Sequence, residues 1–457
     1  MKNYKMLLSL LLFLLLISCA DTGKKGQPNW QELFNGRDFT GWVQKGGEAV
    51  YEIADGVIIG TSVMNTGNSF LCTDKDYGDF IMELEFKVDP VLNSGVQIRS
   101  LSYPEYNNGR VHGYQVEIDP SARAWTGGIY DEARRGWLYA LTEPEQEEAR
   151  NAFKNNDWNK FRVEAIGNHI KTWVNDIPVT NLFDEETAEG FIALQVHSIR
   201  DSSRAGTQVM WRNIRIITES PEKFSTATTA PERSYLNNKL TENEIANGWK
   251  LLFDGETNTG WRKAYHDSFP EKGWRIENGI LTVEASGGGE SRYGGDIVTT
   301  DRYSDFELQL QVRLTPGANS GVKYFVTEQE EGHVGSAIGP EYQILDDSAH
   351  PDSNKGAIPG SRTLGSLYDL IPAGKKRVNG TGQWNTIRIV SKDRHVEHWL
   401  NGFKLFEYER GSEEFRELVA KSKFKNQPGF GEAEDGHILL QDHGNEVSFR
   451  NIKIRRL

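Results

Sequence analysis

Hydrophobic and polar residues alternate with a period of two in many short stretches of the chain. Residues 84–88 are Leu-Glu-Phe-Lys-Val, and residues 308–312 are Leu-Gln-Leu-Gln-Val. A period of two places alternate side chains on opposite faces of a strand. Short stretches of this kind, separated by Gly, Asn and Asp, are typical of antiparallel β-sandwiches. The pattern therefore predicts an all-β chain.

Few segments of the chain favour a helix. Helices are expected at residues 143–154 and 412–423, the second with Ser412 as its N-cap. Thr241 and Glu244 form a capping-box pattern that predicts another short helix. Asn401-Gly402 is a strong two-residue signal for a β-hairpin turn.

The sequence contains an internal repeat. Residues 93–96, Asn-Ser-Gly-Val, recur at 319–322, and Leu-Gln-x-His at 194–197 recurs at 440–443. Ordered matches at nearly constant spacing indicate two tandem copies of one domain. We place copy one at residues 30–218, a linker at 219–246 and copy two at 247–457. Six tryptophans that recur by position are expected in the sandwich cores: Trp42, Trp158, Trp173, Trp261, Trp384 and Trp399.

The first 18 residues have the pattern of an export signal. A lysine-containing start precedes an apolar run at residues 6–17, and the segment ends in Leu16-Ile17-Ser18-Cys19. This ending resembles a bacterial lipobox, in which Cys19 would become the lipid-modified first residue. Residues 19–29 then form a tether, and Ala20 after the cysteine favours the outer membrane. An ordinary signal peptide with a chance cysteine is the alternative.

Charge and cysteine content narrow the possible functions. The 457 residues carry a net charge of −13 and contain no block of Lys or Arg, so a nucleic-acid partner is not expected. Beyond Cys19 the only cysteine is Cys72, which lies in an apolar stretch. Without a second thiol for a disulfide, Cys72 is expected to be a buried structural residue.

The repeated motifs resemble the 3-keto-disaccharide hydrolase domain family over nearly all of both copies. In copy two the resemblance rests on residues 253–255, 319–321, 341–346, 367–369, 398–402, 422–424 and 440–444. Copy one keeps Gly-Gly-Ile-Tyr at 127–130 but lacks the later helix and the Ser-Lys-Phe segment. The resemblance implies two concanavalin-like (jelly-roll) sandwiches. It also implies activity on glycosides with a ketone at carbon 3, which a separate oxidoreductase would produce.

A ketone at carbon 3 acidifies the hydrogen on carbon 2, so the site needs a base, an enolate stabiliser and an acid. The catalytic candidates are Glu341, His443 and Tyr368 in copy two, and Glu117, His197 and Tyr130 in copy one. The candidates for substrate binding are Gln343, Gln441, Gln115, Gln195, Trp125, Trp137 and Arg362. Asp346 is a candidate oxygen ligand for a divalent cation, which is the one cofactor considered.

The pairs Gln115/Glu117 and Glu341/Gln343 are spaced by two, so each pair points to one face of its strand. Each candidate also has a structural explanation, such as a buried histidine, a turn-forming aspartate or a packed tyrosine. Copy two is expected to be the catalytic unit because its motif set is fuller. The rival function is a non-catalytic carbohydrate-binding lipoprotein, in which Glu341 and His443 would not converge on one cleft.

Overall fold

The computed structural model describes residues 27–287, 289, 293–328 and 337–457. The expected signal at residues 1–18, Cys19 and the tether up to residue 26 lie outside the described residues. Among the helices of the described part, none is long and apolar enough to cross a membrane.

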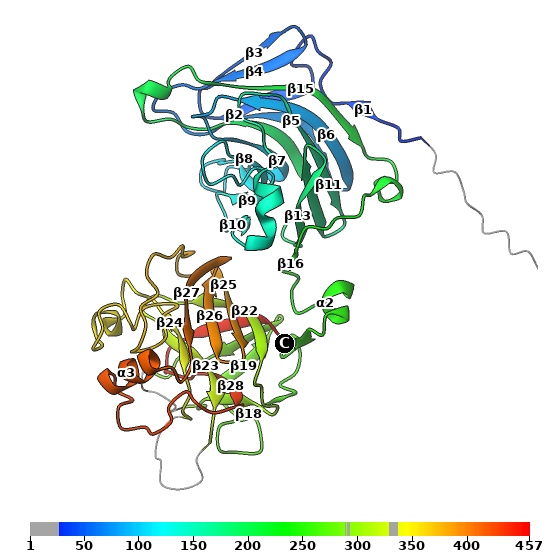
Figure 1. Cartoon of the computed structure of the whole chain (residues 1–457). Helices are drawn as coiled ribbons and strands as arrows, with labels where there is room; N and C mark the ends of the chain where they lie inside the picture. Colours follow the sequence, from blue (N-terminus) through cyan, green and yellow to red (C-terminus); the bar gives the residue numbers. More distant parts are fainter. Residues whose placement is uncertain (1–26, 288, 290–292, 329–336) are drawn as a thin grey trace, which may run out of the picture.

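Copy one is a sandwich of two sheets, as Figure 1 shows, and its strands pair antiparallel except for β16, which the linker adds in parallel to one edge. One sheet has the order β16-β13-β12-β11-β6-β15-β4-β3 with β1 beside β15, and the other has the order β10-β9-β8-β7-β14-β5-β2. The strands are β1 (Gln31–Glu32), β2 (Trp42–Gly46), β3 (Val50–Ala54), β4 (Val57–Thr61), β5 (Ser69–Tyr77), β6 (Phe80–Val88), β7 (Ser94–Leu101), β8 (His112–Ile118), β9 (Ile129–Glu132), β10 (Gly136–Tyr139), β11 (Asn159–Ile166), β12 (His169–Val174), β13 (Ile177–Phe183), β14 (Gly190–Val196), β15 (Gln208–Ile217) and β16 (Glu232–Ser234).

Copy two repeats this architecture. One sheet has the order β19-β20-β29-β22-β25-β26-β27 with β17 beside β29, and the other has the order β18-β21-β28-β23-β24. Its strands are β17 (Lys250–Leu251), β18 (Trp261–Lys263), β19 (Trp274–Glu277), β20 (Ile280–Val283), β21 (Ile297–Thr299), β22 (Phe306–Leu314), β23 (Asn319–Val326), β24 (Glu341–Leu345), β25 (Trp384–Lys392), β26 (His395–Leu400), β27 (Phe403–Glu409), β28 (His437–Leu440) and β29 (Val447–Arg456). The predicted all-β fold with two jelly-roll sandwiches is therefore confirmed.

The helices are short. The structure contains α1 (Glu147–Arg150), α2 (Glu242–Ala246) and α3 (Glu413–Lys421). Ser412 and Thr241 cap α3 and α2 as predicted. The helix expected over 143–154 is shorter than predicted, because Phe153 packs against the core and the Lys154 N–H bonds to Asn159. The linker is partly ordered, since β16 pairs in parallel with β13.

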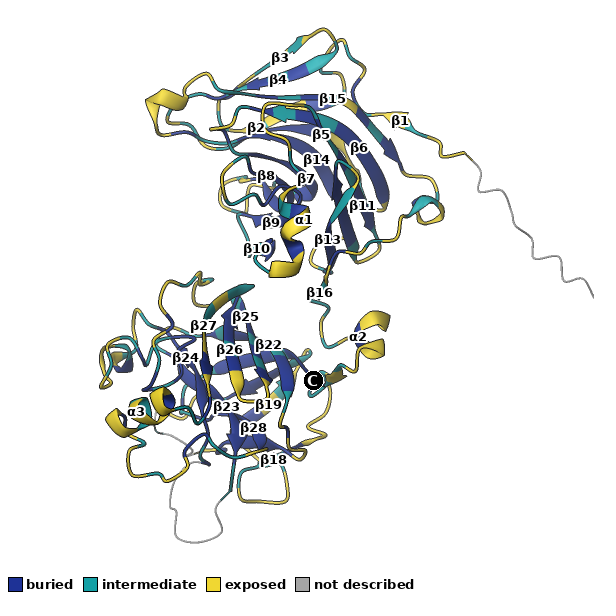
Figure 2. Cartoon of the chain, in the orientation of Figure 1, coloured by how far each residue is buried: buried dark blue, intermediate teal, exposed yellow. Residues whose placement is uncertain are grey.

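The apolar faces of the two sheets enclose a core in each copy, and Figure 2 shows the buried residues running along the facing strands. Cys72 is fully buried, and burial raises the pKa of its thiol to about 12, as expected for a structural residue. The prediction that all six repeated tryptophans are core residues is wrong. Trp158 and Trp384 are only half-buried and lie under Arg212 and Arg450, with guanidinium carbons 3.9 and 4.3 Å from the ring centroids.

Two further members of that tryptophan set are buried on the outer face of a sheet. The guanidinium carbon of Arg162 lies 5.9 Å from the Trp173 ring centroid, and that of Arg388 lies 4.8 Å from the Trp399 ring centroid. The repeat showed that these positions correspond in the two copies. It did not show which face of the sheet they occupy.

Candidate active site

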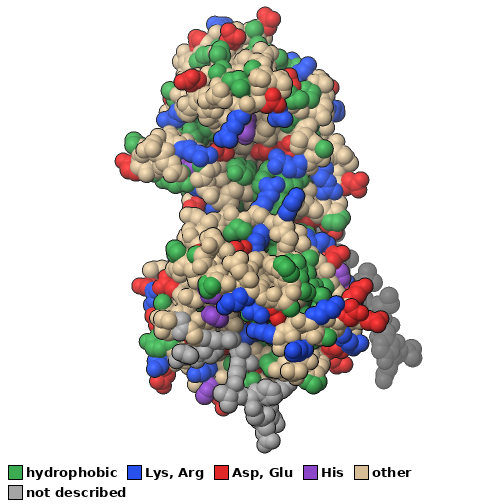
Figure 3. All heavy atoms as spheres, turned by 90° about the vertical axis from the view of Figure 1, so that its left-hand side faces the viewer, with side chains coloured by type: hydrophobic (Ala, Val, Ile, Leu, Met, Phe, Trp, Pro, Cys, Tyr) green, Lys and Arg blue, Asp and Glu red, His purple; other side chains and the backbone are tan. Residues whose placement is uncertain are grey.

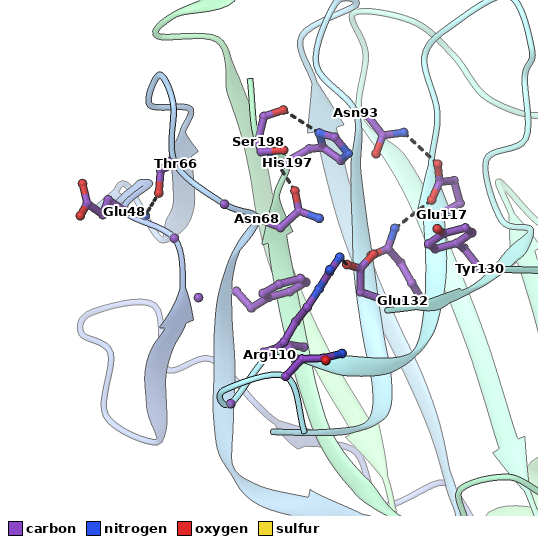
Figure 4. A pocket seen from close by; sticks show the side chains of 18 of the residues that line it. Glu48, Thr66, Asn68, Asn93, Arg110, Glu117, Tyr130, Glu132, His197 and Ser198 are labelled. Atoms are coloured by element: carbon purple, nitrogen blue, oxygen red, sulfur yellow. Dashed lines mark hydrogen bonds and ion pairs between the residues drawn. The ribbon is translucent and has the colours of Figure 1, made fainter. Parts of the chain in front are cut away.

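A cavity of about 1140 Å³ opens over the second sheet of copy one. Five of the predicted residues line it: Gln115, Glu117, Tyr130, Trp137 and His197. They come from β8, β9, β10 and the segment after β14, so strands distant in sequence meet at one place. Figure 4 shows Glu117, Tyr130 and Glu132 on one side of this cavity, with His197 and Asn68 across from them.

Glu117 is a buried carboxylate held by three donors. Its Oε1 accepts hydrogen bonds from Asn93 Nδ2 at 2.8 Å and from Arg123 at 3.2 Å. Its Oε2 accepts from Gln115 Nε2 at 2.8 Å. Burial outweighs these donors and raises the pKa of Glu117 from 4.5 to about 7. A carboxyl group with this pKa can accept or release a proton near neutral pH.

Gln115 links Glu117 to a buried amide network. Its Oε1 accepts from Gln97 Nε2 at 2.6 Å and from Gln195 Nε2 at 2.7 Å. These two bonds fix which end of the Gln115 amide faces Glu117. Gln195 was predicted to bind substrate, but it is fully buried behind Gln115 and orients that amide instead.

The glycine of the repeated Asn-Ser-Gly-Val motif makes room for these side chains. Gly95 lies opposite Glu117 in the β7–β8 ladder, and a Cβ on Gly95 would lie 2.5 Å from Cδ of Gln115. In copy two, Gly321 lies opposite Gln343, and a Cβ there would lie 2.3 Å from Oε1 of Glu341. Both copies therefore require glycine here so that a polar side chain can cross the neighbouring strand.

Aromatic rings form another wall of the cavity. Tyr130 and Trp137 meet edge to face with centroids 5.3 Å apart. Burial raises the pKa of Tyr130, so its phenol keeps its proton at neutral pH. Trp125 was predicted to be an exposed sugar platform, but it is buried behind Trp137 and reinforces the wall from the rear.

His197 is half-buried at the cavity wall, and its Nδ1 lies 2.8 Å from the Ser198 carbonyl oxygen. The sequence reasoning missed Arg110 and Glu132, which also line the cavity and form an ion pair at 3.1 Å. Neither residue belongs to a motif that the repeat preserves. Asn93 was inside a repeated motif, and this signal could have identified it.

Copy two contains a related cluster. Glu341 and Gln343 are buried on β24, and the amide of Gln343 lies close to Asn319 and Glu341. The Tyr368 hydroxyl donates to Asp352 Oδ2 at 3.0 Å. The Tyr368 N–H donates to the Glu341 carbonyl oxygen at 2.9 Å, which places the two residues side by side. Burial raises the pKa of Tyr368, and the charges of Asp352 and Glu341 act in the same direction.

His443 and Gln441 follow β28. The His443 ring is half-buried, with its centroid 6.0 Å from that of His350, whose Nδ1 accepts from the Asp352 N–H at 3.2 Å. Gln441 is buried, and its backbone bonds to β23. A series of contacts through His350 and Asp352 therefore connects His443 to Tyr368.

Two other predicted residues in copy two have structural partners. Arg362, predicted to bind substrate, donates to Asp369 at 2.7 Å and to Asp352 at 3.2 Å, so it holds two carboxylates together. Asp346, predicted to bind a cation, accepts hydrogen bonds from Ser348 Oγ at 2.6 Å and the Gly317 N–H at 2.8 Å. These bonds hold its pKa below the ordinary value against the effect of burial.

Among the described residues, the grouped donors with metal-ligand spacing are His395, Glu397 and Glu407, and Asp346 does not belong to this group. The three residues lie on β26 and β27, away from the predicted sites. Lys404 already pairs with Glu397 at 3.2 Å and with Glu407 at 2.5 Å, which accounts for the cluster without a cation.

Copy one thus combines a jelly-roll sandwich with a large cavity, aromatic side chains and a few polar groups that converge on it, which is the usual make-up of a small-molecule site. The family model of the 3-keto-alpha-glucoside-1,2-lyase-like domain matches residues 29–217 and again residues 248–455. The chain therefore belongs to this family in two tandem copies, and the resemblance seen in the sequence is confirmed.

The chain is also similar to individual known proteins. The chain is 35% identical over 233 residues to a 3-keto-disaccharide hydrolase of Bacteroides thetaiotaomicron, a match that covers 46% of this chain and 79% of the relative. A solved structure from Parabacteroides distasonis, assigned as a glycosyl hydrolase, is 35% identical with a TM-score of 0.43. The match covers 48% of this chain and 99% of the chain in that structure. A carbohydrate-binding module of Bacillus subtilis is 18% identical with a TM-score of 0.28, and the match covers 39% of this chain and 95% of the module. The family and the curated relative identify the chain as a glycoside-acting hydrolase.

Proposed function

We propose that copy one cleaves 3-keto-glycosides, with Glu117 removing the proton from carbon 2 and the substituent on carbon 1 leaving. The observation that carries this proposal is the buried Glu117 carboxyl group, whose pKa burial raises to about 7, at the wall of a cavity large enough for a saccharide. The relative from Bacteroides thetaiotaomicron is named for action on 3-keto-disaccharides, which supports the same substrate class.

The arrangement suits each step of this reaction. The Glu117 carboxylate takes the proton from carbon 2, and burial favours the neutral acid that results. The electron pair left at carbon 2 is delocalised onto the oxygen at carbon 3 as an enolate. The guanidinium groups of Arg110 and Arg123 line the same cavity and lower the energy of that negative charge.

The enolate then collapses. The electron pair returns to form the double bond between carbons 1 and 2, and the bond from carbon 1 to the leaving oxygen breaks. Tyr130 supplies the proton to that oxygen, because burial raises the pKa of its phenol and keeps it protonated. This elimination yields an unsaturated 3-keto sugar, and addition of water across its double bond completes hydrolysis.

The test is incubation of the full chain with a 3-keto-disaccharide and with its unoxidised parent, followed by mass spectrometry of the products. Turnover of the keto sugar alone is expected, and Glu117→Gln should abolish the share that copy one contributes. Glu48→Gln is the matched control, because Glu48 lines the same cavity but is exposed. No product from the wild-type chain with any 3-keto-glycoside would remove the proposal and favour the carbohydrate-binding alternative.

We also infer that copy two acts on the same class of substrate, with Glu341 as its base. Glu341 is buried on β24 beside Gln343, and Tyr368 is in the same cluster as a proton donor. The prediction that copy two is the main catalytic unit is tested by comparing Glu117→Gln, Glu341→Gln and the double variant. The activity lost in each single variant measures the share of that copy.

We further propose that the chain is exported and anchored to the outer membrane through a lipid on Cys19. The lipobox pattern at residues 16–19 supports this proposal. Cys19→Ser should move the protein from the membrane fraction to the soluble fraction without changing the specific activity. Retention of Cys19→Ser in the membrane fraction would refute lipid anchoring at this residue.

A further inference from the structure

The turn between β26 and β27 of copy two contacts copy one. Figure 1 shows β25 and β27 on the side of copy two that faces copy one. Phe403, just after the Asn401-Gly402 turn, packs against the core of copy one, with its ring centroid 5.7 Å from that of Trp125. The Thr142 hydroxyl donates to the Gly402 carbonyl oxygen at 2.9 Å. The copies therefore meet directly behind the aromatic wall of the copy-one cavity.

Arg377 extends from this contact into the lining of the copy-one cavity. Its carbonyl oxygen accepts from Asn401 Nδ2 at 3.0 Å, which ties its backbone to the turn. Its guanidinium carbon lies 4.6 Å from the Phe403 ring centroid and 5.6 Å from that of Trp125. In the view of Figure 3, Lys and Arg side chains gather beside hydrophobic ones near the junction of the two copies.

The guanidinium of Arg377 differs from the other two in this cavity. Arg123 pairs with Asp119 at 2.7 Å and Arg110 pairs with Glu132 at 3.1 Å. Among the interactions of the described residues, Arg377 has ring contacts and no carboxylate partner. Its side chain is exposed, so its N–H groups remain available to a bound molecule.

The cavity has room for more than one sugar ring. Its volume of about 1140 Å³ lies above the roughly 300–1,000 Å³ of pockets that hold drug-sized ligands. A ring bound with its carbon 2 at Glu117 occupies only part of this space. Trp137 and Arg377 line the cavity as well. We place the group attached to carbon 1 beside these two side chains.

Resting on the function proposed above, we propose that Arg377 of copy two binds the hydroxyl groups of the leaving sugar in the copy-one site. The site is then complete only in the tandem chain. A planar guanidinium stacked on aromatic rings loses little freedom on binding and offers several N–H donors to neighbouring hydroxyls. Arg377 thus selects substrates whose leaving group is itself a sugar, and it takes no part in proton transfer.

The experiment compares two substrates in the full chain: a 3-keto-disaccharide, and a methyl 3-keto-glucoside that lacks the second sugar. Glu341→Gln is present throughout, so that copy one is measured. Arg377→Ala should raise KM for the disaccharide about tenfold or more, with kcat changed less than about threefold. The methyl glycoside should be affected less than about twofold. Lys375→Ala is the matched control, since Lys375 is exposed on the same loop and does not line the cavity.

A purely structural role for Arg377 predicts a different result. Phe403→Ala removes the ring contact between the copies and one of the two rings that the Arg377 guanidinium packs on, but it keeps the guanidinium itself. Equal effects of Arg377→Ala on both substrates, matching those of Phe403→Ala, would overturn the inference. Unchanged KM for the disaccharide in Arg377→Ala would also overturn it.

The inference and the proposed function fail in different ways. An inactive wild-type chain contradicts the proposed function, and binding of the unoxidised disaccharide is then measured by calorimetry. Weaker binding of the disaccharide to Arg377→Ala, but not to Lys375→Ala, still supports a role in sugar binding. Equal binding to wild type and Arg377→Ala overturns it.

Discussion

The most discriminating perturbation is Glu117→Gln, because it removes a charge and a base while keeping the size of the side chain. We expect kcat for copy one to fall by about 10²- to 10⁴-fold, the usual contribution of a general base. The measurement uses the Glu341→Gln background, so that turnover by copy two does not mask the loss.

The same substitution has a pH-dependent effect on stability. The pKa of Glu117 is raised to about 7 in the folded chain against an ordinary value of 4.5, so the folded state binds this proton more tightly. The resulting stabilisation is fully present below pH 4.5 and is lost as the pH rises through about 7. The difference between the two pKa values corresponds to about 3 kcal/mol as an upper bound.

The Glu117→Gln variant lacks this pH dependence of stability, because an amide does not titrate. Its amide also places an NH₂ group beside the Gln115 Nε2 donor, which lies 2.8 Å from Glu117 Oε2. That mismatch of two donors costs about 1–3 kcal/mol at every pH. The variant should therefore be less stable than wild type at pH 4.5, and the gap should close by up to about 3 kcal/mol by pH 8.

The assay is urea unfolding of both proteins between pH 4.5 and 8, together with the pH profile of kcat/KM. Wild-type activity should rise with pH through about 7 as Glu117 loses its proton. Parallel stability curves for wild type and Glu117→Gln would show that Glu117 does not titrate in this range. Retained turnover by the variant would remove Glu117 from the base role, and His197 would then be the next candidate.

Two further substitutions test the scaffold of the sites. Gly95→Ala should lower kcat of copy one about 10- to 100-fold, because its Cβ would lie 2.5 Å from Cδ of Gln115 and displace it; Gly67→Ala, with nothing within 4 Å of its Cβ, is the control, and full activity of Gly95→Ala would refute the packing argument. Arg362→Met should reduce the free energy of unfolding in urea by about 3–5 kcal/mol because it breaks the ion pair of the buried Asp369 carboxylate. Lys355→Met, which removes an exposed partner of Asp352 at 3.8 Å, should change it by less than about 1 kcal/mol. Unchanged stability of Arg362→Met with a raised KM would instead place Arg362 on the substrate.

The fold was predictable from local patterns. The period of two predicted strands, and the repeated motifs predicted two copies, which the two matched family regions confirm. The spacing of Gln115 and Glu117 placed both side chains on one face of β8, and both line the cavity. The strand class and the shared face depend on residues near each other in sequence, so backbone geometry determines them, whereas the duplication follows from the recurrence of motifs.

The chemistry of the site was not predictable in the same way. The pKa of Glu117 depends on its burial and on Asn93 and Arg123, which other segments bring to it. Gln195 and Trp125 are polar and aromatic side chains that suit a sugar, yet both are buried behind the wall of the cavity. Whether a side chain touches the cavity or supports it depends on which strands pair, and local sequence does not encode that.

The β class and the shared face of the paired polar residues can be read from the sequence alone, because both follow from periodicity along one strand. The duplication can also be read from it, because the same motifs recur in the same order at nearly constant spacing. The position of the large described cavity in copy one, and the place of Arg377 of copy two in its lining, depend on how the chain folds in three dimensions. The physical reason is that burial, and with it the pKa of a carboxyl group, comes from packing between distant segments. In this chain the contact behind the cavity wall depends on a turn at residues 401–402, which belongs to the other copy.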